Sequence, residues 1–149
     1  MDPIVLYGNP EEGGEFGFIP GEIDGLSLSF STYFGVYLDE TTFLLIAKPI
    51  LRHAPIVHSG DPVVQRPVWE KIIEDLEALA IRVSQADNLS ELDDDLWFHT
   101  DVTGHSADKA EFQKDFSANA KALVGVIGEL VAWLRETLKT HEAILIDTD

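Results

Sequence analysis

A long run of apolar residues at helical spacing, in the last third of the chain, sets the strongest limit on the fold. These residues lie within an arc about 80° wide on a helix, and further apolar residues widen the arc in its second half. They are Phe112, Phe116, Leu123, Ile127, Leu130, Leu134 and Leu138, widened by Val124, Val126, Val131 and Trp133. A helix that is apolar over most of its girth lies in a core. We therefore expect one long helix over residues 106–140, with Ser106 as its N-cap.

The interior of this expected helix carries two glycines. Gly125 and Gly128 each cost about 1 kcal/mol relative to alanine, so they indicate either close packing by another element or a break. The most apolar stretch, residues 122–134, has 13 residues and one charge, Glu129. A bilayer requires about 20 apolar residues, so this stretch is too short to span one.

A second helix is expected over residues 67–86. Pro67 suits a first helical turn, and apolar residues then follow at spacings of three and four. They are Trp69, Ile72, Ile73, Leu76, Leu79, Ala80 and Val83. Residues 89–98 are expected to form either a short helix capped by Ser90 or a loop that leads into a strand.

The N-terminal half has the pattern of strands. Residues 26–31 alternate strictly between apolar and hydroxyl side chains. Short β-rich runs at residues 3–7, 16–19, 33–38 and 42–47 add further expected strands, whereas residues 49–67, with four prolines, are expected to be irregular. A last strand at residues 143–146 is expected to join the sheet edge. Taken together, the pattern predicts a single α+β domain over residues 1–149, with a mainly antiparallel sheet and the two main helices on one of its faces.

The charge of the chain restricts its partners. It has 27 acids, 10 bases and no cysteine, so its net charge is −17. Such a chain repels nucleic acid and anionic membranes, and it attracts a basic protein. The charge is densest in residues 61–100, with a net of −7. The N-terminus lacks the basic region of a signal peptide, which favours a cytoplasmic location. Plain solubility is the alternative explanation of the acidity.

Motifs for catalysis, cofactors and metals are weak. The glycine-rich residues 8–25 hold five acids, no base and no phosphate-loop motif, so they indicate either a mobile loop or a loop that wraps a partner. His99, Asp101 and His105 are the best metal candidates, but ordinary loop histidines explain them as well. We therefore expect no cofactor and favour a non-enzymatic role.

Two acidic segments are the candidate partner-binding sites. On the expected helix 67–86, Glu70, Glu74 and Glu77 form one stripe, in which Ile81 exposes an apolar side chain. In the second segment, acids precede a tryptophan, and aromatic anchors with an acidic rim hold Arg or Lys side chains. This segment comprises Glu91, Asp93, Asp94, Asp95 and Trp97. The alternatives are a solvated helix face and a solvated acidic turn that leads into the core.

These features favour a small acidic protein-binding domain, monomeric or homodimeric. By analogy of size and charge alone, an inhibitory or immunity-type protein that neutralises a basic partner, such as a bacterial toxin domain, fits best. The first alternative is a dimeric chaperone or adaptor with Trp133 and Val126 at its interface. The second is a small metal- or ligand-binding enzyme that uses residues 99–105.

Overall fold

The computed structural model describes residues 1–9, 11–24, 27–30, 35–55 and 63–147. The elements within these residues follow in chain order: β1 (Phe16–Asp24), β2 (Ser27–Phe30), β3 (Val36–Leu38), α1 (Glu40–His53), β4 (Val63–Gln65), α3 (Arg66–Gln85), the 3₁₀ helix η2 (Leu89–Leu92), α4 (Ala107–Lys114), α5 (Phe116–Leu138) and β5 (Ala143–Asp147). The α+β prediction is confirmed.

The sheet is antiparallel, with the order β2-β1-β5-β4, and β3 also pairs with β1. The C-terminal strand was expected at an edge, but β5 lies between β1 and β4. The strand is paired along both edges, because Ile146 pairs with Phe18 and Ile144 pairs with both Pro20 and Val64. Ala143, Ile144 and Ile146 are buried, whereas Leu145 and Asp147 are partly exposed.

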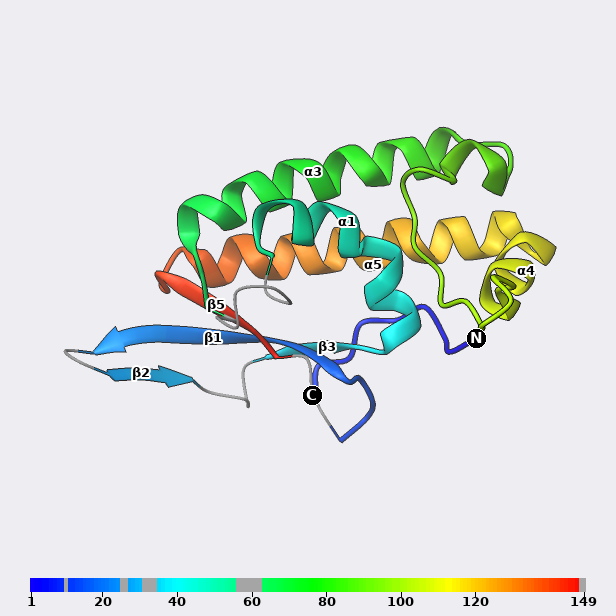
Figure 1. Cartoon of the computed structure of the whole chain (residues 1–149). Coiled ribbons are helices and arrows are strands. Elements are labelled where there is room, and N and C mark those ends of the chain that lie inside the picture. Colours follow the sequence, from blue (N-terminus) through cyan, green and yellow to red (C-terminus); the bar gives the residue numbers. More distant parts are fainter. Residues whose placement is uncertain (10, 25–26, 31–34, 56–62, 148–149) are drawn as a thin grey trace.

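The helices lie on one face of the sheet (Figure 1). The core between the two layers is built around aromatic contacts. The ring of Phe18 on β1 meets Trp69 on α3 edge-on, with 6.0 Å between centroids, and Phe16 stacks on Phe43 of α1 at 4.2 Å. The indole Nε1 of Trp69 donates to the carbonyl oxygen of Ile144 at 3.3 Å, which joins α3 to the centre of the sheet. The packing of the two main helices on one face is therefore as expected.

Residues 42–47 form part of a helix, so the expected strand there is wrong. Helix α1 covers Glu40–His53 and contains Pro49. Its buried residues include Phe43, Ile46, Ala47 and Ile50, which recur at spacings of three and four. Burial of that stripe outweighs the β-propensity of the β-branched and aromatic residues in this run. The expected irregular segment 49–67 thus contains the end of α1 and all of β4, while residues 56–62 lie outside the described residues.

The expected helix 106–140 is two helices that break at Asp115. Ser106 caps the first, α4, as predicted, by accepting a hydrogen bond from the backbone N–H of Lys109 at 3.1 Å. Asp115 has φ −130° and ψ 58°, which are not helical values. The side chain of Asn119 donates to the carbonyl oxygen of Phe112 at 3.1 Å, so it satisfies a carbonyl at the end of α4. The break therefore lies ten residues before the glycines that were suspected of causing one.

Smaller expectations also changed. The expected strand at residues 3–7 is a single bridge between Tyr7 and Tyr37. In the segment 89–98, η2 is capped by Asn88 rather than Ser90, in a capping box that Glu91 completes.

Candidate partner-binding surface

The glutamate stripe on α3 is exposed, but it is only partly free of ion pairs. Glu70 and Glu74 make no side-chain hydrogen bond or ion pair within the described residues, whereas Glu77 pairs with Arg135 of α5. Ile81 continues the stripe with 56% of its surface exposed. The structure thus brings the four predicted residues onto one face, and three of them are available to a partner.

A groove of about 440 Å³ lies beside this stripe, between the start of α3 and the end of α5. It is lined by Arg66, Glu70, Ile73, Glu74, Arg135, Leu138 and Lys139. Arg66 pairs with Glu142 at 3.1 Å and Lys139 with Glu136 at 2.9 Å. Of the three bases that line the groove, Arg135 and Lys139 come from the end of α5, opposite the stripe, and Arg66 comes from α3 itself.

The three consecutive aspartates each contact a cation from a different helix. Lys109 of α4 pairs with Asp93 at 3.2 Å, and Arg82 of α3 pairs with Asp95 at 2.9 Å. The ammonium of Lys48 on α1 donates to the backbone carbonyl of Asp94 at 2.6 Å. The triplet therefore connects three helices, and the carboxylates of Asp93 and Asp95 already form ion pairs with cations of the chain itself. Glu91 is committed as well, because its carboxylate accepts from the backbone N–H of Asn88 at 3.1 Å.

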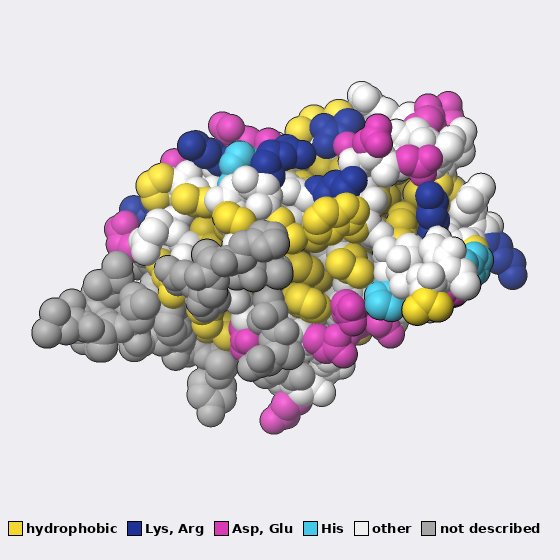
Figure 2. All heavy atoms as spheres, in the orientation of Figure 1, with side chains coloured by type: hydrophobic (Ala, Val, Ile, Leu, Met, Phe, Trp, Pro, Cys, Tyr) yellow, Lys and Arg dark blue, Asp and Glu magenta, His cyan; other side chains and the backbone are white. Residues whose placement is uncertain are grey.

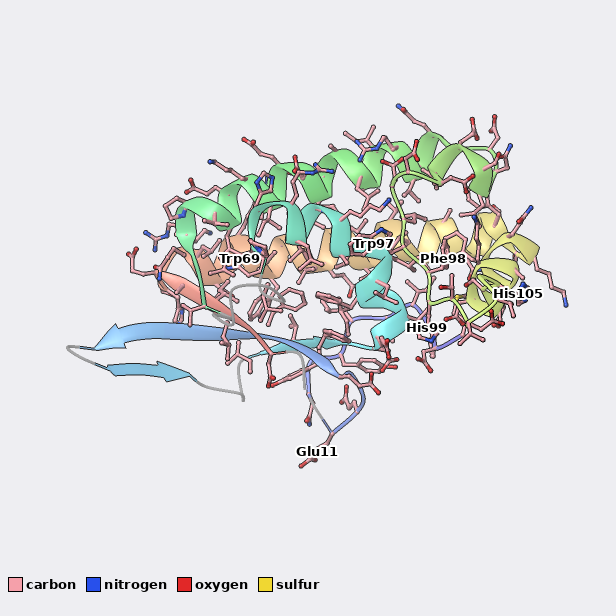
Figure 3. The ribbon with its side chains drawn as sticks, in the orientation of Figure 1. Glu11, Trp69, Trp97, Phe98, His99 and His105 are labelled. Carbon is pink, nitrogen blue, oxygen red and sulfur yellow. The ribbon has the colours of Figure 1, made fainter. Side chains whose placement is uncertain are left out.

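The two neighbouring aromatic residues have different surroundings (Figure 3). Trp97 is 41% exposed, and the Nζ of Lys48 lies 5.7 Å from its ring centroid. Phe98 turns inward, where its ring meets that of Phe112 edge-on at 5.7 Å. The ring of Trp97, which was expected to contact a cation of the partner, therefore already contacts Lys48 of the chain itself.

The histidine loop has a structural role within the described residues. One oxygen of Asp101 accepts three hydrogen bonds: from the backbone and hydroxyl of Thr103 at 2.8 and 2.6 Å, and from the backbone of His105 at 3.0 Å. The bonds from Thr103 are the main cause that lowers the pKa of Asp101 below its usual value. No cluster of three metal-binding side chains occurs in the described part of the chain. His99 and His105 also lie well apart along the loop (Figure 3).

The clearest charge feature of the molecule is the segregation of its bases, which we did not expect. All ten Lys and Arg residues lie between residues 48 and 139. Residues 1–47 carry eight acids and residues 140–149 carry three, without a single Lys or Arg. We call these two stretches the base-free segments. They form all of β1, β2, β3 and β5, and β4 is uncharged. The sheet therefore carries acids that no base on its own strands neutralises.

The acidic loop before β1 packs on two tyrosines. Tyr7 and Tyr37 exchange backbone hydrogen bonds of 2.9 and 2.8 Å. A Cβ built on Gly13 would lie 2.9 Å from the ring of Tyr7, and one on Gly14 would lie 2.6 Å from the Cβ of Tyr37. Both glycines have positive φ, so this packing requires glycine. The described part of the predicted glycine-rich loop is therefore folded against the protein itself.

This packing leaves a row of carboxylates outside. The side chains of Glu11, Glu12 and Glu15 are exposed and make no ion pair within the described residues. Tyr7 donates to Asp39 at 3.0 Å, and this hydrogen bond raises the pKa of Tyr7 above its usual value. Figure 2 shows acidic side chains gathered where β3 leads into α1, with no Lys or Arg among them on this face.

The two residues expected at the interface of a dimeric adaptor pack in or against the core. Val126 is only 4% exposed, and Trp133 packs against the core from the flank of α5. Both side chains therefore contribute to the fold, so neither forms an apolar surface patch.

The chain matches no family model, and it shows significant similarity to no curated protein and to no solved structure.

Proposed function

We propose that this chain is a protein-binding domain of the inhibitory or immunity type, which captures a basic protein partner in the cytoplasm. The observation that carries the proposal is the segregation of charge: the base-free segments supply eleven acids and no Lys or Arg. Opposite charge steers a basic partner toward such a surface and suppresses acidic competitors, including nucleic acid.

The exposed carboxylates of Glu11, Glu12 and Glu15 form one part of the proposed surface, and Glu70 and Glu74 form the second. Neither set makes an ion pair in the described structure, so binding a partner does not require breaking internal contacts. The proposed contributions of Asp93, Asp94, Asp95, Glu91 and Trp97 are smaller, because most of these groups are already engaged by the chain's own cations and backbone. A toxin domain that acts on nucleic acid fits as such a partner, since that activity requires a basic surface.

The test begins with capture of partners from the protein's own cells at low and high salt. The captured protein is then purified, and its affinity is measured by calorimetry. We expect a basic protein whose affinity falls as salt rises, mainly through slower association. A partner whose binding does not respond to salt would contradict the proposal.

Charge-reversal variants then locate the surface. Replacing Glu11, Glu12 and Glu15 by lysine, or Glu70 and Glu74 by lysine, should weaken binding by about tenfold or more while the domain stays folded. Glu77 is left unchanged, because reversing it would place a lysine against Arg135. The matched control is Asp115→Lys, at an exposed residue between α4 and α5 that makes no ion pair within the described residues, and it should leave affinity nearly unchanged. Unchanged affinity in both multiple variants would remove these carboxylates from the binding surface.

A further inference from the structure

Helix α5 has an exposed face whose middle part, between Lys121 and Glu136, carries a single charge. We call it the outer face of α5; it is a strip of exposed residues spaced by three and four. Its members are Ala118, Lys121, Gly125, Gly128, Glu129, Ala132, Glu136 and Lys139, the last being the C-cap residue. Between Lys121 and Arg135 the helix carries a single charge, Glu129. The exposed side of a surface helix normally carries mostly polar and charged residues.

The composition of α5 is that of a helix covered on all sides, but its burial is not. By length and hydropathy alone, Phe116–Leu138 is apolar enough to cross a membrane, yet only 39% of its most apolar window is buried in the fold. One side of α5 packs on α3 in the core, and the outer face has no partner within the described residues. This helix face is therefore available for contact with another molecule.

The two glycines of the outer face have open space around them within the described residues. A Cβ built on Gly125 or Gly128 meets no atom within 4 Å, and neither residue has positive φ. Glycine weakens a helix relative to alanine, so its presence is unfavourable for the isolated chain. Small residues on a helix do allow the backbone of a second helix to approach closely.

The charges of the outer face favour a second copy of this chain as the occupant. Two lysines and two glutamates make the face neutral, which does not suit the basic partner proposed above. They are, however, self-complementary in an antiparallel arrangement. With a two-fold axis between Gly128 and Glu129, Lys121 of one copy lies opposite Glu136 of the other, and Gly125 lies opposite Ala132. Symmetry makes each of these contacts twice.

We propose that α5 forms an antiparallel, two-fold interface with α5 of a second copy, in this register. Lys121 makes no ion pair within the described residues, and Glu136 makes only an exposed pair with Lys139 of its own chain at 2.9 Å, which it exchanges for Lys121 of the second copy. Both copies are strongly acidic, so salt screens their mutual repulsion and favours the dimer. Capture of a basic partner has the opposite salt dependence, so the two interactions are separable and either one can fail without the other.

The first experiment measures the oligomeric state by sedimentation and light scattering over a range of protein concentrations. We expect a monomer–dimer equilibrium that shifts toward the dimer as salt rises.

Gly125→Leu should raise the dissociation constant by about tenfold or more, because the added side chain holds the helices apart. It should not prevent folding, since the space around Gly125 is open. Gln113→Leu on α4, also exposed, is the matched control and should leave the equilibrium unchanged. A wild-type monomer up to the highest soluble concentration, or a Gly125→Leu dimer as stable as the wild type, would overturn the proposal.

A charge exchange tests the register. Lys121→Glu and Glu136→Lys should each weaken the dimer by about tenfold, because each places like charges opposite one another at two symmetric positions. The double variant Lys121→Glu/Glu136→Lys should recover most of the loss. Circular dichroism confirms that each variant is folded. A double variant as weak as the single ones would show that these two residues do not face each other.

Discussion

Asp75 of α3 makes an ionisable contact with the end of α1. One of its oxygens accepts from Arg52 at 2.9 Å and lies 2.7 Å from Nε2 of His53, both at the end of α1. Burial by itself would raise the pKa of Asp75, but the hydrogen bonds from His53 and Arg52 outweigh it and hold the pKa below its usual value. The ionised carboxylate is therefore the form that the folded state favours.

We expect Asp75→Asn to lower the free energy of unfolding by about 0.5–1 kcal/mol at neutral pH. Because the pKa of Asp75 is lower in the folded than in the unfolded state, its contribution is complete above the unfolded pKa of about 4. It is lost as the pH falls through the folded pKa. Urea unfolding of both proteins between pH 7 and about pH 2.5 checks this, since the difference should shrink only below about pH 4. Asp94→Asn, at an exposed carboxylate without an ion pair in the described part of the chain, is the control. A difference that stays constant down to the lowest pH would contradict the assignment.

Some of the predicted site residues are unpaired and others form ion pairs, and the difference depends on cations that belong to other elements of the fold. Glu70 and Glu74 are exposed and unpaired within the described residues, as an acidic stripe predicts. Glu77 lies on the same stripe but pairs with Arg135, 58 residues further along the chain. Asp93 and Asp95 are likewise engaged by Lys109 and Arg82. Helical spacing reveals which side chains share a face, but the cation opposite that face belongs to another element.

At the scale of elements, the long helices were predictable and α1 was not. The apolar stripe of α3 covers 20 residues, so its period is unambiguous. Residues 42–47 are too few to show a helical period, and the β-branched and aromatic residues among them favoured a strand. The buried positions of α1 extend from Thr41 to Ile50, and across that longer stretch the spacing is helical. The break at Asp115 was missed for a related reason, since the apolar stripe continues across it.

The two glycines of α5 give a prediction at this scale. Gly125→Ala and Gly128→Ala should each raise the free energy of unfolding by roughly 0.5–1 kcal/mol, because alanine favours the helix and its Cβ meets nothing. Gly14→Ala should instead destabilise the protein, since Gly14 has φ +103° and its Cβ would lie 2.6 Å from the Cβ of Tyr37. Denaturant titration of the three variants, at a concentration where the wild type is monomeric, measures these changes. A loss of stability in the α5 variants would mean that close packing, rather than open space, surrounds these glycines.

At the scale of the whole molecule, charge differs between the structural layers: the strands carry acids and no base, and all ten bases lie outside the strands. Residues 61–100 have the densest net charge along the sequence, but they also contribute three bases on α3, which are Arg66, Lys71 and Arg82. The base-free segments are separated by 92 residues in the chain, and the pairing of β1 with β5 brings them together. They hold eleven of the 27 acids and no Lys or Arg of their own, and of these acids Glu142 pairs with Arg66 of α3.

This distribution predicts how salt affects stability. Repulsion among the carboxylates of a chain with net charge −17 opposes folding, and added salt screens it. We expect the melting temperature to rise by a few degrees between about 20 mM and 0.5 M NaCl. Replacing Glu11, Glu12 and Glu15 by glutamine should reduce this response, because it removes three unpaired charges from one loop. Differential scanning calorimetry tests both expectations, and a melting temperature that falls with salt would indicate that the ion pairs between helices dominate instead.

The sequence by itself determined the properties that depend on local pattern and total composition. The α+β class, the extent of α3, the cap at Ser106 and the net charge all follow from periodicity, local hydrogen bonding and simple counting. The tertiary structure decided which element each residue meets: the interior place of β5, the pairing of Glu77 with Arg135, the fate of the Asp triplet and the meeting of the base-free segments. These depend on contacts between residues far apart in the chain, and a single sequence contains no record of distance in space.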